Sequence, residues 1–414
     1  MRITILSVGS RGDVQPLLAF GVGLEAAGHD VRFTTYPRFE PQVRALGLDF
    51  AALAEGEISA MQAGVKTSVS PRRRIRRPPV LDLIADARSV ARVRLAEAMS
   101  ACAGAEAVVT NELALLLGWQ ACERYGAQLV RARLCPPPRI AERPGARAVR
   151  QLAWLPMRRS QRVARRELGL GPLPLREPLG RLAERRTLEL RAYSEAVLVD
   201  PEPAGEWTHV TGFWFLDSHF DPEPAPEVIE FLDAGPAPVC VNFGSMFNAR
   251  AAAAATTMVS DALRRAGQRG VLIRGVDGFG AGQLPADMLA VGAIDHDWLF
   301  PRCCAVVHHG GAGTVAAVLR AGLPSVVVPH MLDQHAWGRT IQELGVGPAP
   351  ISRRRLNGES LTAAITTALG DAHMRARAGE IGARIRGEQG VANAVEAFEQ
   401  HMQGAGRRSV LEKT

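Results

Sequence analysis

Strand and helix patterns alternate over two long stretches of the chain, and this alternation constrains the fold more than any other feature. Arg2–Val8 has the apolar spacing of a buried strand, Val14–Ala27 has helical spacing, and Val31–Thr35 is a further strand. A strand, a helix and a strand joined by short loops form a parallel βαβ unit. The first stretch is therefore predicted to fold as an α/β domain.

A second series of the same kind starts at the strand Val239–Asn242. Its further strands are predicted at Val271–Arg274, Ala305–His308 and Ser325–Pro329. Between the two series lie residues 217–227, DSHFDPEPAPE, whose four acidic residues and three prolines predict an extended linker. We therefore expect two α/β domains, residues 1–216 and 228–390, with a ligand-binding cleft between them.

Positive charge is concentrated in the first half of the 414-residue chain. Residues 1–215 carry 31 basic and 22 acidic side chains, a net charge of +9, whereas residues 216–414 carry 18 and 20, a net charge of −2. Net charge of this size concerns solubility and association, not fold. No nucleic-acid recognition motif accompanies it, so we expect no nucleic-acid partner.

The cysteines and the N-terminus indicate a soluble intracellular protein. None of the six cysteines forms a Cys-x-x-Cys pair or another paired metal-ligand spacing, which favours reduced thiols in a cytosolic enzyme. The N-terminal apolar run is too short for a signal peptide, and no stretch approaches the about 20 apolar residues that span a bilayer. We therefore expect a cytoplasmic protein without a metal site.

Two arginine-rich segments of the first half depart from the strand–helix pattern. Arg72–Arg77 contains five arginines without aromatic residues between them. A solvated loop is the plain interpretation, and contact with a membrane surface or an acidic acceptor is the alternative. Residues 131–166 carry eleven arginines and several prolines, so we expect irregular surface with short helices there.

The segment after the strand Ala305–His308 has the composition of an anion-binding loop. It reads His308-His309-Gly310-Gly311-Ala312-Gly313-Thr314 and opens a predicted helix that ends at Ala321. Glycines let a ligand approach the backbone, and the amides and dipole of a helix N-terminus favour phosphate. His309 and the Thr314 hydroxyl can add donors. An ordinary glycine-rich turn is the plain alternative, which the two histidines disfavour.

Two other phosphate-binding motifs compete for this segment. A P-loop requires a lysine that the segment lacks. The dinucleotide fingerprint G-x-G-x-x-A is matched from Gly311 to Ala316, and Asp333 follows at the distance of a ribose-binding acid. An NAD(P)-dependent oxidoreductase is therefore a second hypothesis, although the segment does not follow the first strand of the chain.

Asp333 and Gln334 follow the strand Ser325–Pro329 and form a further candidate site. A carboxylate beside an amide supplies an acceptor and a mixed donor and acceptor, which suits the vicinal hydroxyls of a sugar. The alternative is structural, with Asp333 as the N-cap of a helix over His335–Leu344.

Two strand–turn segments carry the remaining candidates. Gly9–Asp13 ends the first strand, at the sheet edge where open α/β folds bind ligands. Asp13 is either the N-cap of the first helix or a general base that takes a proton from a hydroxyl. Ser245 lies in the equivalent turn of the second domain and could contact the same ligand as residues 308–314, although a plain turn remains the alternative.

Four segments together resemble nucleotide-sugar glycosyltransferases of the GT-B fold. They are GSRGDVQP near the N-terminus, VNFGSM at 241–246, DHDWLFPRCCAVVHHGGAGT at 295–314 and PHMLDQHAWG at 329–338. Bacterial enzymes of glycopeptide and macrolide pathways and sterol glucosyltransferases share this pattern. The resemblance implies two Rossmann-like α/β domains facing a central cleft, with a C-terminal helix, residues 391–402, that returns to the first domain before a tail at 403–414.

The resemblance also implies an activity, the inverting and metal-independent transfer of a hexose or deoxyhexose. The donor would be a UDP- or dTDP-sugar, a co-substrate and not a cofactor, and the acceptor a hydroxyl of a hydrophobic natural-product aglycone, sterol or lipid-like molecule. Ser245, His309 and residues 310–314 would hold the diphosphate, Asp333 and Gln334 would hold the sugar, and Asp13 would be the base. A catalytically silent homologue that acts as a partner protein is the third hypothesis.

Three positions limit what the resemblance implies. Val291 and Ala317 stand where plant members carry a tryptophan that stacks on uracil and a glutamate that holds the ribose. Recognition of base and ribose is therefore not carried over. Asp13 stands where many plant members have a histidine base, so its assignment follows the bacterial enzymes. The role of His308 is left open.

Overall fold

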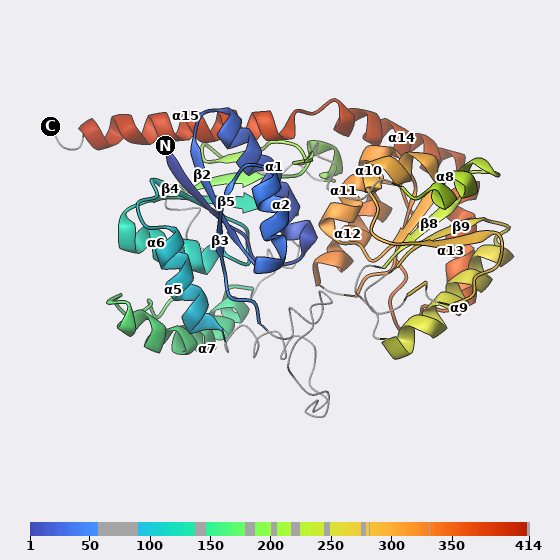
Figure 1. Ribbon diagram of the computed structural model, residues 1–414, viewed down its shortest axis with the longest axis horizontal. Coiled ribbons are helices and arrows are strands. Elements are labelled where there is room, and N and C mark those ends of the chain that lie inside the picture. Colours follow the sequence, from blue (N-terminus) through green and yellow to red (C-terminus); the bar gives the residue numbers. More distant parts are fainter. Residues whose placement is uncertain are drawn as a thin grey trace. The chain divides into compact units, whose positions relative to one another are not determined.

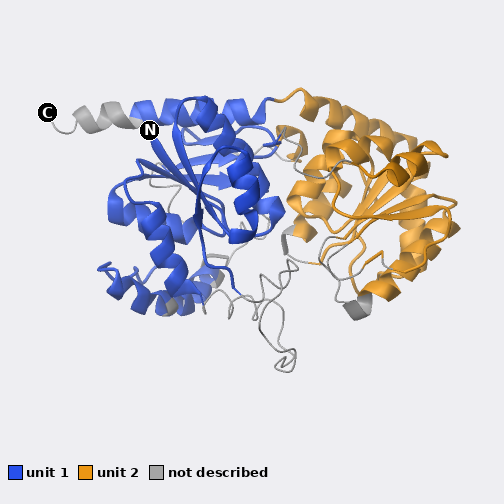
Figure 2. Ribbon diagram, viewed as in Figure 1, with its two compact units in different colours: residues 1–193, 203–216, 389–414 blue, residues 194–202, 217–388 orange. Residues whose placement is uncertain are grey.

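The computed structural model divides the chain into two compact units (Figure 2). Unit 1 contains residues 1–193, 203–216 and 389–414, and unit 2 contains residues 194–202 and 217–388. The structure describes residues 1–56, 90–136, 146–178, 187–199, 205–216, 224–243, 249–274, 279–280, 282–330 and 332–411.

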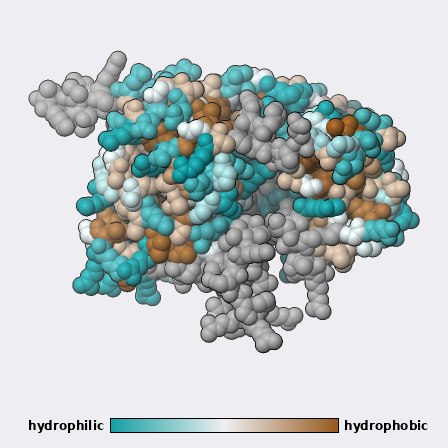
Figure 3. Space-filling view, viewed as in Figure 1, coloured by the Kyte–Doolittle hydropathy of each residue, from teal (hydrophilic) through white to brown (hydrophobic). Residues whose placement is uncertain are grey.

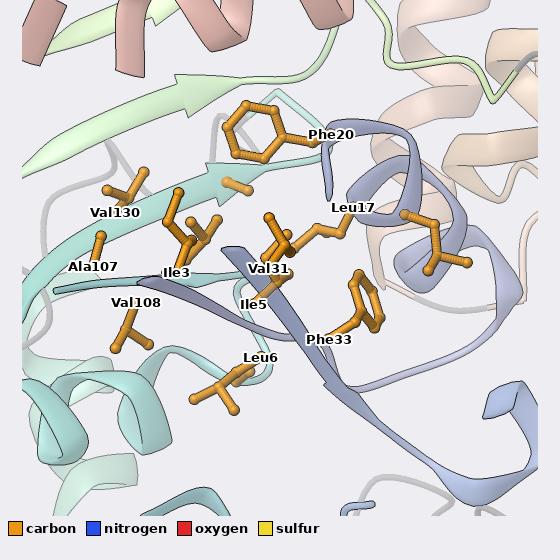
Figure 4. Packing of buried hydrophobic residues seen from close by; sticks show 14 of the residues in the cluster. Ile3, Ile5, Leu6, Leu17, Phe20, Val31, Phe33, Ala107, Val108 and Val130 are labelled. Atoms are coloured by element: carbon orange, nitrogen blue, oxygen red, sulfur yellow. The ribbon is translucent and has the colours of Figure 1, made fainter. Parts of the chain in front are cut away.

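Unit 1 is built on a seven-stranded parallel sheet in the order β3-β2-β1-β4-β5-β6-β7 (Figure 1). The strands are β1 (Arg2–Leu6), β2 (Asp30–Thr35), β3 (Asp49–Ala52), β4 (Ala107–Thr110), β5 (Gln128–Arg133), β6 (Leu188–Arg191) and β7 (Thr208–Val210). Central strands are apolar on both faces because helices cover both sides of the sheet. Figure 4 shows this core, with Ile3 and Ile5 of β1 beside Phe33 of β2 and Phe20 of the first helix.

The helices of unit 1 include one that comes from the end of the chain. They are α1 (Arg11–Ala26), α2 (Glu40–Ala45), α5 (Ala91–Ala101), α6 (Leu115–Tyr125), α7 (Ala146–Glu167) and α15 (Gly390–Leu411). In α15, Phe398 is fully buried and meets Phe20 of α1 edge to face, with ring centroids 6.2 Å apart. Asn393 of the same helix donates to the carbonyl of Thr211 at 3.0 Å. The helix continues to Leu411, so the expectation of a tail over residues 403–414 is wrong for residues 403–411.

The arginine-rich segment 131–166 folds differently from the prediction. Its residues 146–166 belong to α7, one helix of 22 residues, and not to irregular surface with short helices. The inner face of α7 includes Trp154 and Arg165, which are 3% and 1% exposed. The Arg165 guanidinium donates to Gln120 at 3.0 Å and to Glu123 at 2.9 Å. An arginine whose donors are satisfied can occupy a core position, which composition alone does not reveal.

Unit 2 is built on a five-stranded parallel sheet in the order β10-β9-β8-β11-β12. The strands are β8 (Val239–Asn242), β9 (Gly270–Ile273), β10 (Met288–Val291), β11 (Ala305–His308) and β12 (Ser325–Val327). The helices are α8 (Pro226–Asp233), α9 (Ala249–Arg265), α10 (His296–Leu299), α11 (Ala312–Ala321), α12 (Leu332–Glu343), α13 (Gly358–Gly370) and α14 (Ala372–Arg386). The predicted fold class, parallel sheets covered by helices in two α/β units, is confirmed.

Two boundaries of the units differ from the sequence prediction. Residues 194–202 belong to unit 2, and Ser194 is tied there by the hydrogen bond that its hydroxyl donates to Glu388. Helix α8 begins at Pro226, so the last two residues of the predicted linker 217–227 are helical. Proline is well suited to the first turn of a helix, where its missing amide hydrogen has no partner to lose. None of the helices in the described ranges combines the length and the hydrophobicity that a bilayer crossing requires.

Candidate functional site

The glycine-rich loop of unit 2 lies where two adjacent parallel strands end. β8 and β11 pair in register, so that Asn242 stands opposite His308 at the carboxyl edge of the sheet. Residues 309–311 then connect β11 to α11, which begins at Ala312 with Gly311 as its N-cap. The amides of the first helical turn have no acceptor within the helix, and its dipole is positive at this end. The sequence prediction of a loop that opens a helix at this edge is confirmed.

Two close approaches fix the shape of this loop. Gly310 has φ +87°, and a Cβ there would lie 2.9 Å from Val327 and 3.1 Å from the carbonyl oxygen of Gln334. The His309 ring lies beside Gly311, because a Cβ on Gly311 would lie 2.5 Å from His309 Nε2. The ring is therefore held next to the first turn of α11, where a bound anion would contact both.

His309 is half-buried and contacts the neighbouring strand end. Its Nδ1 lies 3.5 Å from the carbonyl oxygen of Asn242. When Nδ1 carries the proton, that carbonyl accepts from it, and Nε2 then needs a second proton to donate to an anion.

His308 is a core residue that supports the glycine-rich loop through a hydrogen bond. Its side chain is fully buried, and its Nδ1 accepts a hydrogen bond from the amide of Gly310 at 3.1 Å. Burial, with smaller contributions from His309 and His296, lowers the pKa of His308 to about 3. The ring is therefore neutral, and since Nδ1 is an acceptor, the proton is on Nε2. The role that the sequence left open is structural support of Gly310.

His296 and Asn242 extend this polar cluster, and sequence analysis assigned neither of them. Asn242 Nδ2 lies 3.1 Å from His296 Nε2. The His296 ring stacks on Phe300, with centroids 4.5 Å apart and planes 14° apart. Asp295 caps α10 by accepting from the Asp297 amide at 2.8 Å. His296 lies near His308 only in the folded structure. No local sequence motif marks it, so the sequence alone could not reveal its place in the site.

Helix α12 brings Gln334 against the glycine-rich loop. Gln334 is 5% exposed, and its Oε1 accepts from the amide of His330 at 2.8 Å. Its backbone lies within contact distance of Gly310. The helix begins at Leu332, so Asp333 is its second residue and the alternative role of Asp333 as an N-cap is wrong. The side chain of Asp333 lies outside the described residues, as do Ser245 and Arg72–Arg77.

The Asp13 turn of unit 1 is a capping box. Ser10 is the N-cap of α1, and Asp13 is the third helical residue, so the prediction of Asp13 as the N-cap is wrong. The carboxylate oxygen Oδ2 of Asp13 accepts from the amide of Ser10 at 2.8 Å and from its hydroxyl at 2.9 Å. The half-buried carboxylate thus has a fixed orientation at the carboxyl edge of the sheet.

Two further side chains, neither of them predicted from the sequence, hold this turn in place. Arg38 donates to the carbonyl of Gly9 at 2.9 Å, forms an ion pair with Glu55 and lies over the Tyr36 ring. Burial lowers the pKa of Arg38. Directly after β4, the side-chain amide of Asn111 donates to the carbonyl of Val8 at 2.8 Å. Both contacts join segments that are far apart in the sequence, so no local sequence pattern predicts them.

The two positions that depart from the plant pattern are core positions. Val291 and Ala317 are 5% and 8% exposed and belong to one hydrophobic cluster with Phe300 and Val306. Neither side chain has the ring or the carboxylate that the plant enzymes use. Recognition of base and ribose therefore cannot be assigned to these two positions.

Comparison with known proteins identifies related sequences and folds. Residues 3–111 match the glycosyltransferase family 28 N-terminal domain, and residues 272–396 match the C-terminal domain of the erythromycin biosynthesis protein CIII-like family. The chain is 32% identical over 421 residues to the O-mycaminosyltylonolide 6-deoxyallosyltransferase of Streptomyces fradiae, covering 97% of both chains. It is 31% identical over 432 residues to a sterol 3-beta-glucosyltransferase of Debaryomyces hansenii, covering 95% of this chain but only 26% of that longer protein.

The solved structures agree with this assignment at the level of fold. The glycosyltransferase SsfS6 of Streptomyces sp. SF2575, complexed with thymidine diphosphate, superposes with a TM-score of 0.62. The alignment covers 97% of this chain and 99% of that chain at 21% identity. The likeness extends over both units, since nearly the whole chain is covered.

Proposed function

The chain belongs to the GT-B glycosyltransferases, and on that premise we propose that it moves a hexose or deoxyhexose from a UDP- or dTDP-sugar to a hydroxyl of a hydrophobic small molecule. The observation that carries this proposal is the position of His309 beside Gly311 at the N-terminus of α11. A histidine side chain and the free backbone amides of the first helical turn are suited to bind a diphosphate.

In this proposal the diphosphate lies over the glycine-rich loop. The Gly310 amide is already bound to His308, so the amides of residues 311–314 and the Nε2 proton of His309 donate to its oxygens. Gly310 contributes the open backbone of the loop, and the Thr314 and Ser245 hydroxyls add contacts. These donors stabilise the negative charge that grows on the diphosphate as it leaves, in place of a metal ion. Asp333 and Gln334 hold hydroxyls of the donor sugar, since the backbone of Gln334 lies next to Gly310.

Asp13 is proposed as the general base. Its carboxylate takes the proton from the acceptor hydroxyl while that oxygen attacks the anomeric carbon. The bond from the anomeric carbon to the diphosphate oxygen breaks, and its electron pair leaves with the diphosphate. Attack opposite the leaving group inverts the configuration. The two hydrogen bonds from Ser10 orient the carboxylate for this step.

Relatives support both the donor and the acceptor class. The Streptomyces fradiae enzyme is named as a 6-deoxyallosyltransferase that acts on O-mycaminosyltylonolide, and the Debaryomyces hansenii enzyme as a glucosyltransferase that acts on sterols. SsfS6 was solved with thymidine diphosphate. Macrolides and sterols share a large apolar body with few hydroxyls, which is the acceptor chemistry proposed for this chain.

A binding and transfer screen tests the proposal. UDP, dTDP and NADH are titrated separately, and UDP- and dTDP-sugars are then assayed with macrolide aglycones and sterols, with and without a chelator. We expect one nucleoside diphosphate to bind, transfer to occur with inversion, and the chelator to have no effect. NADH binding that neither diphosphate displaces would instead support the oxidoreductase hypothesis. Binding without transfer to any acceptor would support a silent homologue.

A further inference from the structure

Exposed apolar side chains gather on one side of unit 1. Eleven large apolar residues of the described part are exposed, and six of them belong to α7 or to segments packed beside it. These six are Val93, Leu152, Leu155, Met157, Val163 and Leu175. Figure 3 shows hydrophobic and hydrophilic side chains intermixed over the region where Figure 1 draws α5 and α7. Such clustering indicates an interaction surface, whereas scattered exposed residues would not.

The outer side of α7 carries its apolar residues at helical spacing. Leu152, Leu155 and Val163 follow one another at intervals of three and eight residues, which places them on one side of the helix. Leu152 is 68% exposed and Val163 61%. The opposite side is the buried one, with Trp154 and Arg165 facing the core of the unit. The exposed apolar residues are therefore in excess of what α7 needs to pack on its own unit.

Neighbouring segments widen this surface. Gln151 of α7 donates to the carbonyl of Leu175 at 2.8 Å, which fixes the exposed Leu175 side chain close to the start of the helix. Arg92 of α5 pairs with Glu167 at 2.6 Å and brings the exposed Val93 close to its end. We call Leu152, Leu155, Val163 and Leu175, with the exposed arginines among them, the α7 face.

The charge of the α7 face is strongly positive. Five arginines of residues 146–178 are exposed, namely Arg150, Arg159, Arg162, Arg166 and Arg176, against two glutamates in the same segment. The two glutamates are already engaged, since Glu167 pairs with Arg92 and Glu177 lies 3.9 Å from Arg150. Exposed Arg159, Arg162 and Arg166 form no ion pair with any residue of the described ranges. Their charge is therefore available to an anionic partner.

We propose that the α7 face docks unit 1 on an anionic lipid bilayer. A helix with arginines and apolar residues on its exposed side lies in the plane of an interface, where the apolar side chains enter the acyl boundary and the guanidinium groups remain at the lipid phosphates. The exposed arginines complement the charge of an anionic bilayer, and the acyl boundary beneath the phosphates also takes up the apolar side chains between them. The proposal is independent of the transfer reaction and of Arg72–Arg77.

Vesicle binding by the full chain tests this proposal. The wild type is sedimented with vesicles of phosphatidylcholine alone and with vesicles that also contain phosphatidylglycerol, at low and at high salt. We expect binding to the anionic vesicles only, and weaker binding as salt is raised. Equal binding to both kinds of vesicle, or binding to neither, would overturn the proposal.

Two variants and two matched controls separate the apolar and the charged contributions. Arg159→Gln/Arg162→Gln/Arg166→Gln should lower vesicle affinity about a hundredfold, since each arginine near an anionic surface contributes about fivefold. Leu152→Ser/Val163→Ser removes two apolar side chains from the acyl boundary and should lower it at least about tenfold. The controls Ile229→Ser and Arg265→Gln/Arg375→Gln/Arg384→Gln alter exposed residues of unit 2 and should bind as the wild type does. Circular dichroism and nucleotide affinity should be unchanged in all four. Wild-type vesicle affinity in both α7 variants would contradict the proposal.

Discussion

In both units a strand is followed by a glycine-containing turn and a helix. The two units differ in which group compensates the positive dipole at the N-terminus of that helix. In unit 1 the first turn of α1 contains Asp13, whose carboxylate binds back to Ser10. In unit 2 the first turn of α11 contains no acidic residue, and His309 precedes it. The first helix end is satisfied by its own chain, whereas the second is the one at which we propose that the diphosphate of a ligand binds.

The largest effect should come from removing the charge of Asp13 while keeping its capping role. Asp13→Asn retains an oxygen that accepts from Ser10, so α1 should remain intact. General-base catalysis contributes roughly 10²–10⁴-fold, so we expect kcat to fall by at least about a hundredfold. Nucleotide affinity should stay within a few-fold of the wild type. A normal rate of transfer in this variant would mean that Asp13 is only part of a capping box.

Removing the His309 ring should weaken binding of the nucleoside diphosphate at the N-terminus of α11. A hydrogen bond to a charged group contributes about 1.5–3 kcal/mol, so His309→Ala should weaken binding of the nucleoside diphosphate roughly 10- to 100-fold. Turnover should fall with it, because the same contact stabilises the leaving group. Isothermal titration measures the affinity, and His373→Ala, at an exposed position of α14, is the control. Unchanged affinity would place the diphosphate elsewhere.

A methyl group at Gly310 should deform the loop itself. Its φ of +87° and the 2.9 Å approach to Val327 both oppose a side chain. We expect Gly310→Ala to lower the free energy of unfolding by about 1–3 kcal/mol. Gly292→Ala is the matched control, because a Cβ there meets no atom within 4 Å. Urea denaturation followed by circular dichroism compares the two, and equal stability would show that the loop can rearrange.

The last expected effect concerns acid stability and is smallest at neutral pH, because it develops only as the pH falls. The pKa of His308 is about 3 in the folded protein and near 6.5 in the unfolded chain, so the unfolded chain binds the extra proton between these values. Stability is therefore fully present above pH 6.5 and falls as the pH decreases toward 3. His308→Asn keeps an acceptor for Gly310 without this titration. Its free energy of unfolding should fall less steeply in that range, by about 1.4 kcal/mol per pH unit. Equal slopes would contradict a neutral buried His308.

Sequence patterns predicted the parallel strands well because these strands are buried on both faces. β8 and β11 have the predicted bounds, Val239–Asn242 and Ala305–His308. The pattern gives no sign of α7, because many arginines and prolines are typical of irregular surface. Arg165 shows why, because its charge is compensated by Glu123 of another helix.

The candidate sites show the same division between local and long-range information. The loop 308–314 was predicted because its chemistry is contiguous in the sequence. Ser10 was missed as the N-cap of α1 because Asp13, three residues later, carries the more conspicuous charge. The supports of the two sites, among them Arg38 and His296, are reached only through tertiary contacts.

The return of α15 to unit 1 has a consequence for how the protein is made. Residues 1–193 belong to unit 1, but Phe398 completes the core of that unit only after residues 217–388 of unit 2 have been synthesised. During synthesis, the core of unit 1 therefore remains incomplete until α15 follows unit 2. Chimeric enzymes that exchange the units at residue 216 must move residues 389–414 together with unit 1, and a C-terminal truncation should damage the N-terminal unit first.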